Sequence, residues 1–326
     1  MSARSRALHG FILGTVISLA SVATPAQSDQ AGMRRIGVLE RERMSGEAGL
    51  RDGLRELGYI EGKNLAIEWR PVADQTDENL RTNAVDLMRS HIEVIVAFGT
   101  PESRAALQAT TVPVVFVVGD PVGTGLAESL ARPGGRGTGV SMLNRELTGK
   151  RMDLLRQVVP GARRIALLMN PANPLDARML EEARASARAL GVKLTTFEAS
   201  TAAQLEVRLG AMSRRAADGL LVSNDQLFIA KRAQLAQAVR KARLPAVFPY
   251  REYQENGVLM SYGPSVTEGT HRAAIYVAKI LAGAQPGDLP IEEISSFELV
   301  IDLRVAREMQ IKIPQELLYR ANEVIK

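Results

Sequence analysis

Four short apolar runs, each followed directly by small polar or turn-forming residues, constrain the fold of this chain most strongly. The runs occupy residues 94–98, 114–118, 165–169 and 220–222. Apolar runs rich in β-branched residues are typical of strands buried on both faces, as in parallel sheets. Capping and turn residues placed directly after a strand predict that the chain turns at once into a helix. The sequence therefore predicts an α/β fold with helices that begin at the carboxyl ends of strands.

The run 114–118 shows this pattern most clearly. Gly119, Asp120 and Pro121 follow it and supply a free backbone, a capping carboxylate and a ring suited to a first helical turn, so we expect a helix there. Ligands of open α/β sheets bind at this edge, where free N–H groups and the positive ends of helix dipoles converge. The residues at the strand ends are therefore candidate binding residues. The alternative is that they serve only as helix caps.

The alternation of strands and helices runs from Arg34 and restarts after Gly161. This repeat predicts two Rossmann-like lobes, each built on a parallel sheet. We expect the chain to cross between the lobes near residues 141–147, 261–265 and 290–296. The expected first lobe comprises residues 34–145 plus 264–290, and the expected second lobe comprises residues 146–263 plus 291–326.

The first 26 residues have the pattern of a secretory signal peptide. Arg4 and Arg6 precede an apolar stretch at 11–23, and Thr24-Pro25-Ala26 resembles a small-residue cleavage site. We expect cleavage after Ala26; the alternative is an uncleaved N-terminal anchor. The chain contains no cysteine, which excludes a lipobox, disulfides and a thiolate nucleophile. These features predict a protein of the periplasm that is not a lipoprotein.

Charge and motif content argue against several classes of function. The formal net charge is +5, but the basic residues are dispersed and only 4% of residues are aromatic, so we expect no nucleic-acid partner. The phosphate-loop motif G-x-x-x-x-G-K-[ST], the zinc motif H-E-x-x-H and the EF-hand loop are all missing. The strand ends offer hydrogen-bonding groups without a nucleophile. We therefore expect neither an enzyme nor a bound cofactor or metal ion.

Long segments of the chain resemble one known protein family. They are GLRELGYIEGKNLAIEWR at 53–70, VPVVFVVGDPVGTGLAESLARPGG at 112–135, TGVS at 138–141, LPAVFPYREYQENGVLMSYG at 244–263 and FELVIDLRVAREMQIKIPQELLYRANEVI at 297–325. These segments resemble the ABC-transporter substrate-binding proteins of the tryptophan/tyrosine type. The resemblance implies a type I periplasmic binding fold, with two lobes and three crossovers. It also implies a small-molecule solute as ligand and an ABC permease of the inner membrane as partner, and we expect a monomer.

In such proteins the ligand lies between the lobes against the strand-end loops. The residues implicated here are Gly99, Thr100, Asp120, Ser141, Asn170, Asn224, Asp225 and Tyr250. The segment SNDQLF at 223–228 also resembles the Asn-Asp turn of sugar-responsive repressor cores of this fold. The first βα loop departs from the family's small polar pattern, because it reads Glu40-Arg41-Glu42-Arg43.

The expected ligand is a small polar solute, such as an aromatic or other amino acid or a small carboxylate. We expect Thr100 and the helix beginning at Pro101 to hold an anionic oxygen, because a helix N-terminus favours negative charge. Asp120 or Asp225 is then expected to hold an ammonium group, and Tyr250 to pack against a planar or apolar group. An alternative role is a periplasmic ligand-sensing subunit of a signalling system.

Overall fold

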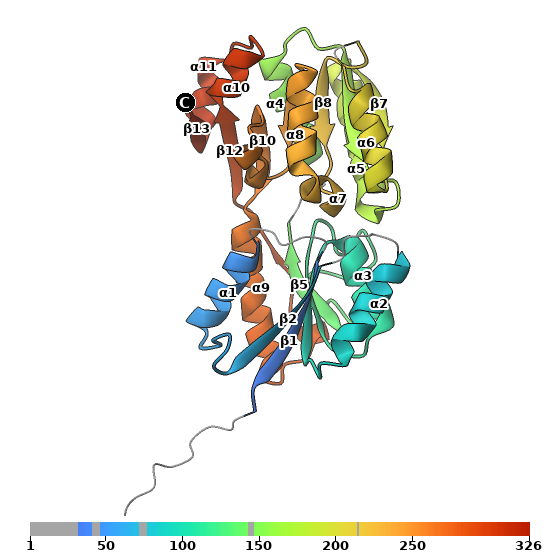
Figure 1. Ribbon diagram of the computed structural model, residues 1–326, viewed down its shortest axis with the longest axis vertical. Helices are drawn as coiled ribbons and strands as arrows, with labels where there is room; N and C mark the ends of the chain where they lie inside the picture. The colour runs from blue at the N-terminus through green and yellow to red at the C-terminus, as the bar shows by residue number, and fades with distance from the viewer. Residues whose placement is uncertain (1–31, 41–45, 72–76, 143–146, 214) are drawn as a thin grey trace, which may run out of the picture. The chain divides into compact units, whose positions relative to one another are not determined.

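The computed structural model describes residues 32–40, 46–71, 77–142, 147–213 and 215–326. The expected signal peptide and residues 41–43 of the first βα loop lie outside these ranges. Met33–Lys326 form one compact unit, whose strands make two separate sheets (Figure 1). Across these ranges, no helix combines the length and apolar character needed to cross a membrane.

The first sheet is parallel throughout and has the strand order β11-β5-β4-β3-β1-β2. Its strands are β1 (Arg34–Glu40), β2 (Leu65–Pro71), β3 (Val94–Phe98), β4 (Val114–Val118), β5 (Gly137–Ser141) and β11 (Glu292–Glu293). Every residue of β3, β4 and β5 is buried, as expected for strands covered on both faces.

The helices that cover this sheet (Figure 1) complete what we call the first lobe. They are α1 (Gly46–Glu56), α2 (Asp77–Met88), α3 (Thr100–Ala109) and α9 (Val266–Leu281). Helices α1 and α9 pack on the face that carries Ile36 and Val96, whereas α2 and α3 pack on the face that carries Leu39 and Ile95. The alternation of side chains along each strand thus gives each face its own core.

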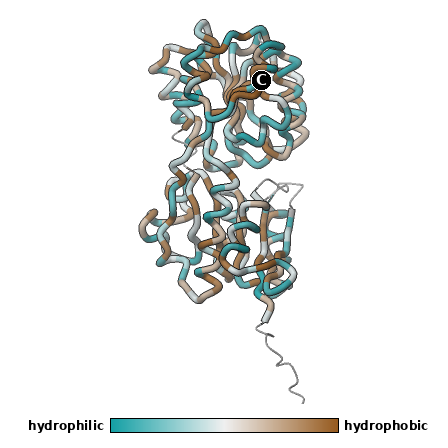
Figure 2. Tube along the Cα trace, turned by 90° about the vertical axis from the view of Figure 1, so that its left-hand side faces the viewer, coloured by the Kyte–Doolittle hydropathy of each residue, from teal (hydrophilic) through white to brown (hydrophobic). Residues whose placement is uncertain are grey.

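The second sheet has the order β13-β12-β10-β9-β8-β6-β7 and is parallel except where β12 meets β10. Its strands are β6 (Arg164–Met169), β7 (Lys193–Glu198), β8 (Gly219–Val222), β9 (Ala246–Phe248), β10 (Met260–Pro264), β12 (Phe297–Asp302) and β13 (Glu323–Ile325). Figure 2 shows the hydrophobic colour concentrated on the strands at the centre of this lobe.

The helices of the second lobe surround this sheet. They are α4 (Leu147–Val158), α5 (Pro174–Leu190), α6 (Ala202–Ala211), α7 (Gln226–Ala230), α8 (Arg232–Lys241), α10 (Leu303–Glu308) and α11 (Gln315–Arg320). Helices α4 and α5 pack on the face that carries Ile165, and α6 and α8 pack on the face that carries Leu168. A short 3-10 helix, η1 (Arg251–Asn256), lies between β9 and β10.

The chain passes between the lobes three times: between β5 and α4, between β10 and α9, and between β11 and β12. Two Rossmann-like lobes with mostly parallel sheets and three crossovers confirm the predicted fold class. The expected boundary after residue 290 falls just before β11, whose residues Glu292 and Glu293 pair with Val140 and Ser141 of the first sheet.

The helix expected after β4 is absent, so that prediction was wrong. Residues 120–126 form consecutive turns, in which the amide of Thr124 donates to the Asp120 carbonyl and that of Leu126 to the Pro121 carbonyl. Gly123 and Gly125 interrupt the segment, and Gly125 has a left-handed backbone with φ of 73°. Glycine costs about 1 kcal/mol in a helix relative to alanine, so a cap and a proline are not enough to start one here.

The apolar residues Val258, Leu259 and Met260 predict a strand at 258–260, but the strand lies further along the chain, at β10. Met260 and Ser261 pair with β9, and the whole of Met260–Pro264 pairs antiparallel with the distant strand β12. This long-range pairing extends the strand through Gly263 and Pro264, which are residues that local propensity excludes from strands.

Candidate ligand-binding site

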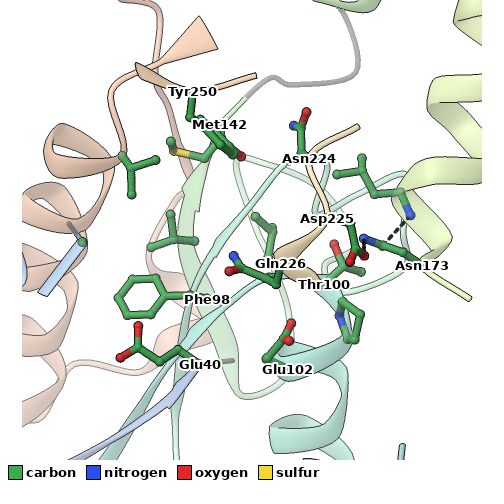
Figure 3. Close-up of a pocket in the computed structure, with 18 residues that line it drawn as sticks. Glu40, Phe98, Thr100, Glu102, Met142, Asn173, Asn224, Asp225, Gln226 and Tyr250 are labelled. Atoms are coloured by element: carbon green, nitrogen blue, oxygen red, sulfur yellow. Dashed lines mark hydrogen bonds between the residues drawn. The ribbon is translucent and has the colours of Figure 1, made fainter. Parts of the chain in front are cut away.

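The carboxyl ends of the first-lobe strands and the loops of the second lobe line one pocket (Figure 3). Its empty volume is about 630 Å³, which includes space open to solvent. The first lobe contributes Glu40, Gly46, Phe98, Gly99, Thr100, Pro101, Glu102, Val117, Val118, Gly119, Met142 and Val266. The second lobe contributes Asn173, Leu175, Asn224, Asp225, Gln226 and Tyr250. A pocket of this size accommodates a small ligand.

The pocket brings together Gly99, Thr100, Asn224, Asp225 and Tyr250 from the set of predicted site residues. Ser141, Asp120 and Asn170 do not line it. The Ser141 hydroxyl lies 3.5 Å from the carbonyl oxygen of Gly119. The ligand-binding roles of all eight residues stay predictions.

Asp225 is held by its own lobe. Its Oδ1 accepts a hydrogen bond from the Leu227 amide at 2.8 Å and so caps α7. Its Oδ2 accepts from the Nδ2 atoms of Asn170 at 3.0 Å and Asn173 at 2.8 Å. The side chain is therefore a helix cap fixed by two amides, one of which belongs to Asn170, a residue that does not line the pocket.

Asp120 makes a contact between the lobes. Its Oδ1 accepts from the Gly123 amide at 2.7 Å, and its Oδ2 lies 3.1 Å from Nε of Arg178 on α5. The same guanidinium donates from Nη1 to the Gly123 carbonyl at 3.1 Å. The carboxylate expected to hold a ligand ammonium thus forms an ion pair with the opposite lobe.

The start of α3 combines a buried hydroxyl with a buried carboxylate. Gly99 caps the helix with φ of 108°, and Thr100 and Pro101 open it. Thr100 Oγ1 is buried and has no hydrogen-bond partner among the described residues. A Cβ at Gly99 would overlap Oε2 of Glu102 and lie 3.1 Å from Cγ of Gln226, so only glycine lets both side chains approach here. The positive end of the α3 dipole therefore already faces the carboxylate of Glu102.

Arg151 is a fully buried cation behind the pocket. It projects from α4, its Nε donates to the carbonyl oxygen of Tyr262 at 2.7 Å, and its Nη1 donates to Oδ1 of Asn224 at 3.1 Å. Burial lowers the pKa of this guanidinium to about 10, so it remains charged at neutral pH. Because Arg151 holds the oxygen of the Asn224 amide, Nδ2 is left as a donor, and it has no partner within the described ranges.

Sequence reasoning missed Arg151 as well as several residues of the lining itself. Arg151 precedes Leu154, Leu155 and Val158 by three, four and seven residues, which places a charge on the apolar stripe of its helix. A charged residue on the apolar face of a helix indicates a buried, partnered side chain, so the sequence contained a signal for Arg151. The missed lining residues with polar or large side chains are Glu40, Phe98, Glu102, Met142, Asn173 and Gln226.

Comparisons with known proteins agree with this geometry. A family model described as ABC transporter substrate binding protein matches residues 39–325. A curated relative, the tyrosine-binding protein of Clostridioides difficile (strain R20291), is 23% identical over 261 residues, which are 79% of this chain and 74% of the relative.

Solved structures share the fold. A conserved domain protein from Vibrio cholerae is 28% identical with a TM-score of 0.84, covering 90% of this chain and 99% of that one. The ABC domain in complex with L-Trp from Streptococcus pneumoniae is 24% identical with a TM-score of 0.81 and the same coverage. Since the family model spans nearly all of the described chain and the lobes enclose a pocket, this protein belongs to the family of ABC transporter substrate-binding proteins.

Proposed function

We propose that this protein is the periplasmic solute receptor of an ABC importer and that it captures an amino acid with a planar or apolar side group. The observation that carries the proposal is a pocket lined by residues of both lobes. A ligand that contacts both lobes binds the closed conformation, in which the lobes meet, more tightly than the open one. The difference between the two binding free energies is the amount by which it stabilises the closed conformation.

The chemistry of the lining supports an amphipathic solute. Phe98, Val117, Met142, Leu175 and Tyr250 provide apolar surface, and Tyr250 is itself 8% exposed. The polar side chains of the lining come from both lobes, which suits a site that orients one small molecule. The relatives named for tyrosine and crystallised with L-Trp support an aromatic amino acid as the first candidate.

Calorimetry and thermal unfolding test the ligand class. We expect L-tryptophan or L-tyrosine to bind the purified protein and to raise its melting temperature. A ligand at 100 times its Kd adds about 2.7 kcal/mol of stability. Binding of a sugar or of a dicarboxylate, with no response to any aromatic amino acid, would contradict this ligand class.

Export and transport require separate tests. We propose that the mature chain begins at Gln27, is not a lipoprotein and is a monomer; mass spectrometry and light scattering of the periplasmic protein check these statements. Uptake of labelled ligand by vesicles that contain the cognate permease is expected to depend on this protein. Ligand-dependent activation of a signalling partner without uptake would favour the sensing role instead.

A further inference from the structure

A buried arginine behind the pocket holds one of the pocket's polar side chains. Arg151 lies on α4 and is 1% exposed, and its Nη1 donates to Oδ1 of Asn224 at 3.1 Å. Asn224 lines the pocket and is 8% exposed. A guanidinium only donates hydrogen bonds, so the amide atom that faces it must be the oxygen. The orientation of the Asn224 amide is therefore set by Arg151.

The position of Arg151 is set in turn by strand β10. Its Nε donates to the carbonyl oxygen of Tyr262 at 2.7 Å. A Cβ at Gly263 would overlap the Pro249 carbonyl oxygen and lie 3.1 Å from Nη2 of Arg151, so glycine lets the strand approach the guanidinium. Arg151 is thus a donor held in place by the backbone of its own lobe.

The Asn224 amide offers a donor to the pocket. Its Nδ2 is buried and has no hydrogen-bond partner among the residues that the structure describes. Two other buried atoms of the lining, Thr100 Oγ1 and Gln226 Oε1, also have no partner within those ranges (Figure 3). A hydroxyl rotates and an unheld amide turns over, so these two groups either donate or accept. The Asn224 amide does not turn over, because its oxygen faces Arg151.

A buried N–H without a partner favours a ligand that accepts a hydrogen bond. Leaving such a donor unpaired costs free energy, and an acceptor oxygen of a bound solute recovers it. Arg151 strengthens this contact, because hydrogen bonds that form a chain polarise one another. A carboxylate is a stronger acceptor than a neutral oxygen. Asn224 is therefore suited to the carboxylate of an amino acid.

We propose that Arg151 is a positioning residue that sets the selectivity of the pocket through Asn224. By holding Oδ1, it commits the Asn224 amide to donate from Nδ2, and the pocket selects solutes with a carboxylate oxygen at this point. Arg151 is not a lining residue, so it acts without contacting the solute. This inference rests on the proposed function. It adds a contact for the anion on the second lobe to the one expected at Thr100 on the first.

A double-mutant cycle with L-tryptophan as the probe separates positioning from a structural role. We expect Arg151→Met and Asn224→Ala each to weaken tryptophan binding about 10-fold in calorimetry. Because Arg151 acts through Asn224, the double variant is also expected to lose about 10-fold, whereas independent effects would multiply to about 100-fold. A loss near the product, or parental affinity in Arg151→Met, would overturn the proposal.

Arg156→Met is the matched control. Arg156 lies on the same helix, but its Nη1 donates to the backbone carbonyl of Leu190 at 2.8 Å and it is not a lining residue. Its replacement also removes a hydrogen bond between an arginine of α4 and the backbone, and we expect the tryptophan affinity to stay at the parental value. A loss equal to that of Arg151→Met would show a general weakening of the lobe and contradict the positioning role.

Asn224→Asp tests the donor without changing Arg151, and it decides the question even where Arg151→Met does not fold. The aspartate keeps the side-chain shape and accepts from Arg151, but it has no N–H to offer. We expect it to melt at or above the temperature of Asn224→Ala and to bind tryptophan about 10-fold more weakly than the parent, or weaker still. Parental affinity in Asn224→Asp would show that the ligand does not use this donor.

The outcomes separate this inference from the proposed function. Parental binding of tryptophan combined with independent losses in the cycle contradicts the role of Arg151 alone. Tryptamine lacks the carboxylate, so its binding as tightly as tryptophan also contradicts this inference alone. A parent that binds tyrosine but not tryptophan is tested in the same cycle with tyrosine. No binding of any aromatic amino acid contradicts the proposed ligand class and this inference with it.

Discussion

The effect of a buried polar side chain on stability depends on whether it has a hydrogen-bond partner. Arg151 donates to the carbonyl oxygen of Tyr262 and to Oδ1 of Asn224, and so orients an amide of the pocket. Tyr253 is equally buried and stacks near Phe248, with ring centroids 4.6 Å apart, but its hydroxyl finds no hydrogen-bond partner among the described residues. Burial raises the pKa of this phenol well above 10, so the hydroxyl stays neutral.

Tyr253→Phe is therefore expected to leave stability unchanged or to raise it by about 1 kcal/mol, because it removes a buried group that makes no hydrogen bond. Urea unfolding measures the change. The matched comparison is Tyr276→Phe, which loses the 2.7 Å hydrogen bond from its hydroxyl to the Pro290 carbonyl and is expected to be destabilised. Clear destabilisation of Tyr253→Phe would contradict the account.

Asp218 gives a prediction for acid stability. It accepts from Nη2 of Arg164 at 2.7 Å and from the amides of Arg163 and Arg164, and the Arg164 hydrogen bond lowers its pKa from 3.8 to about 2. A carboxyl with a lowered pKa in the folded state stabilises the protein above its ordinary pKa and loses this effect as the pH falls toward the folded value.

We therefore expect Asp218→Asn to be less stable than the parent at pH 7, by up to about 1 kcal/mol because the pair is partly exposed. The difference is expected to shrink between pH 4 and pH 2. Chemical unfolding of both proteins across this range checks the prediction. A difference that stays constant down to pH 2 would show that ionisation of Asp218 is not its source.

At the scale of elements, α1 packs closely against α9 because it presents glycines to that helix. Gly46, Gly49 and Gly53 all face α9, and a Cβ at Gly49 would overlap the carbonyl oxygen of Thr267 and Oγ1 of Thr270. Three glycines in an eight-residue stretch disfavour a helix by propensity, so the packing compensates for that cost.

Gly49→Ala is expected to destabilise the protein by about 1–3 kcal/mol, because the added methyl group forces the helices apart. The matched control is Gly210→Ala in α6, where a Cβ meets nothing within 4 Å and which is expected to stabilise by up to about 1 kcal/mol. Thermal unfolding of both variants measures the contrast. Equal effects of the two substitutions would contradict the role of close helix packing.

Elements whose signal is local were predictable from the sequence, and those defined by distant partners were not. For example, the apolar residues of β3 and the Gly-Thr-Pro segment that begins α3 are consecutive in the sequence, so both elements could be predicted. By contrast, two adjacent glutamates such as Glu292 and Glu293 predict solvated surface from sequence alone, yet they form β11, because the neighbouring strand β5 provides the hydrogen bonds. The failed helix after β4 shows that a cap signal does not outweigh glycines within the turn that follows.

The same division holds for the candidate site. Thr100 and Asn224 were found because they follow strands at the edge where ligands bind. Glu40 and Glu102 were missed as pocket residues because an acid near a turn is usually a solvated or capping residue in sequence. Glu40 and Glu102 are buried in a pocket that both lobes line, and each lobe is built from segments that are far apart in the sequence.

At the scale of the whole molecule, an ion pair between Arg178 and Asp120 links the lobes beside the pocket. Arg178 on α5 contacts Asp120 and the carbonyl oxygen of Gly123, both from the turn after β4. A Cβ at Gly123 would overlap Oδ2 of Asp120 and lie 2.6 Å from Nε of Arg178, so glycine permits this approach. The pair stabilises the conformation in which the lobes meet without touching the ligand itself.

Arg178→Gln is therefore expected to weaken L-tryptophan binding about fivefold, which corresponds to about 1 kcal/mol for a partly exposed ion pair. The side chains of Arg178 and Asp120 are 39% and 14% exposed, so high salt is expected to weaken binding by the parent but not by the variant. The control is Arg184→Gln, an exposed arginine of the same helix.

Small-angle scattering checks that the effect acts through lobe closure. Without ligand, the Arg178→Gln variant is expected to have a radius of gyration at least as large as that of the parent. Saturating tryptophan is expected to bring both proteins to the same radius. If Arg178→Gln and Arg184→Gln bind tryptophan alike at low salt, the ion pair has no part in closure.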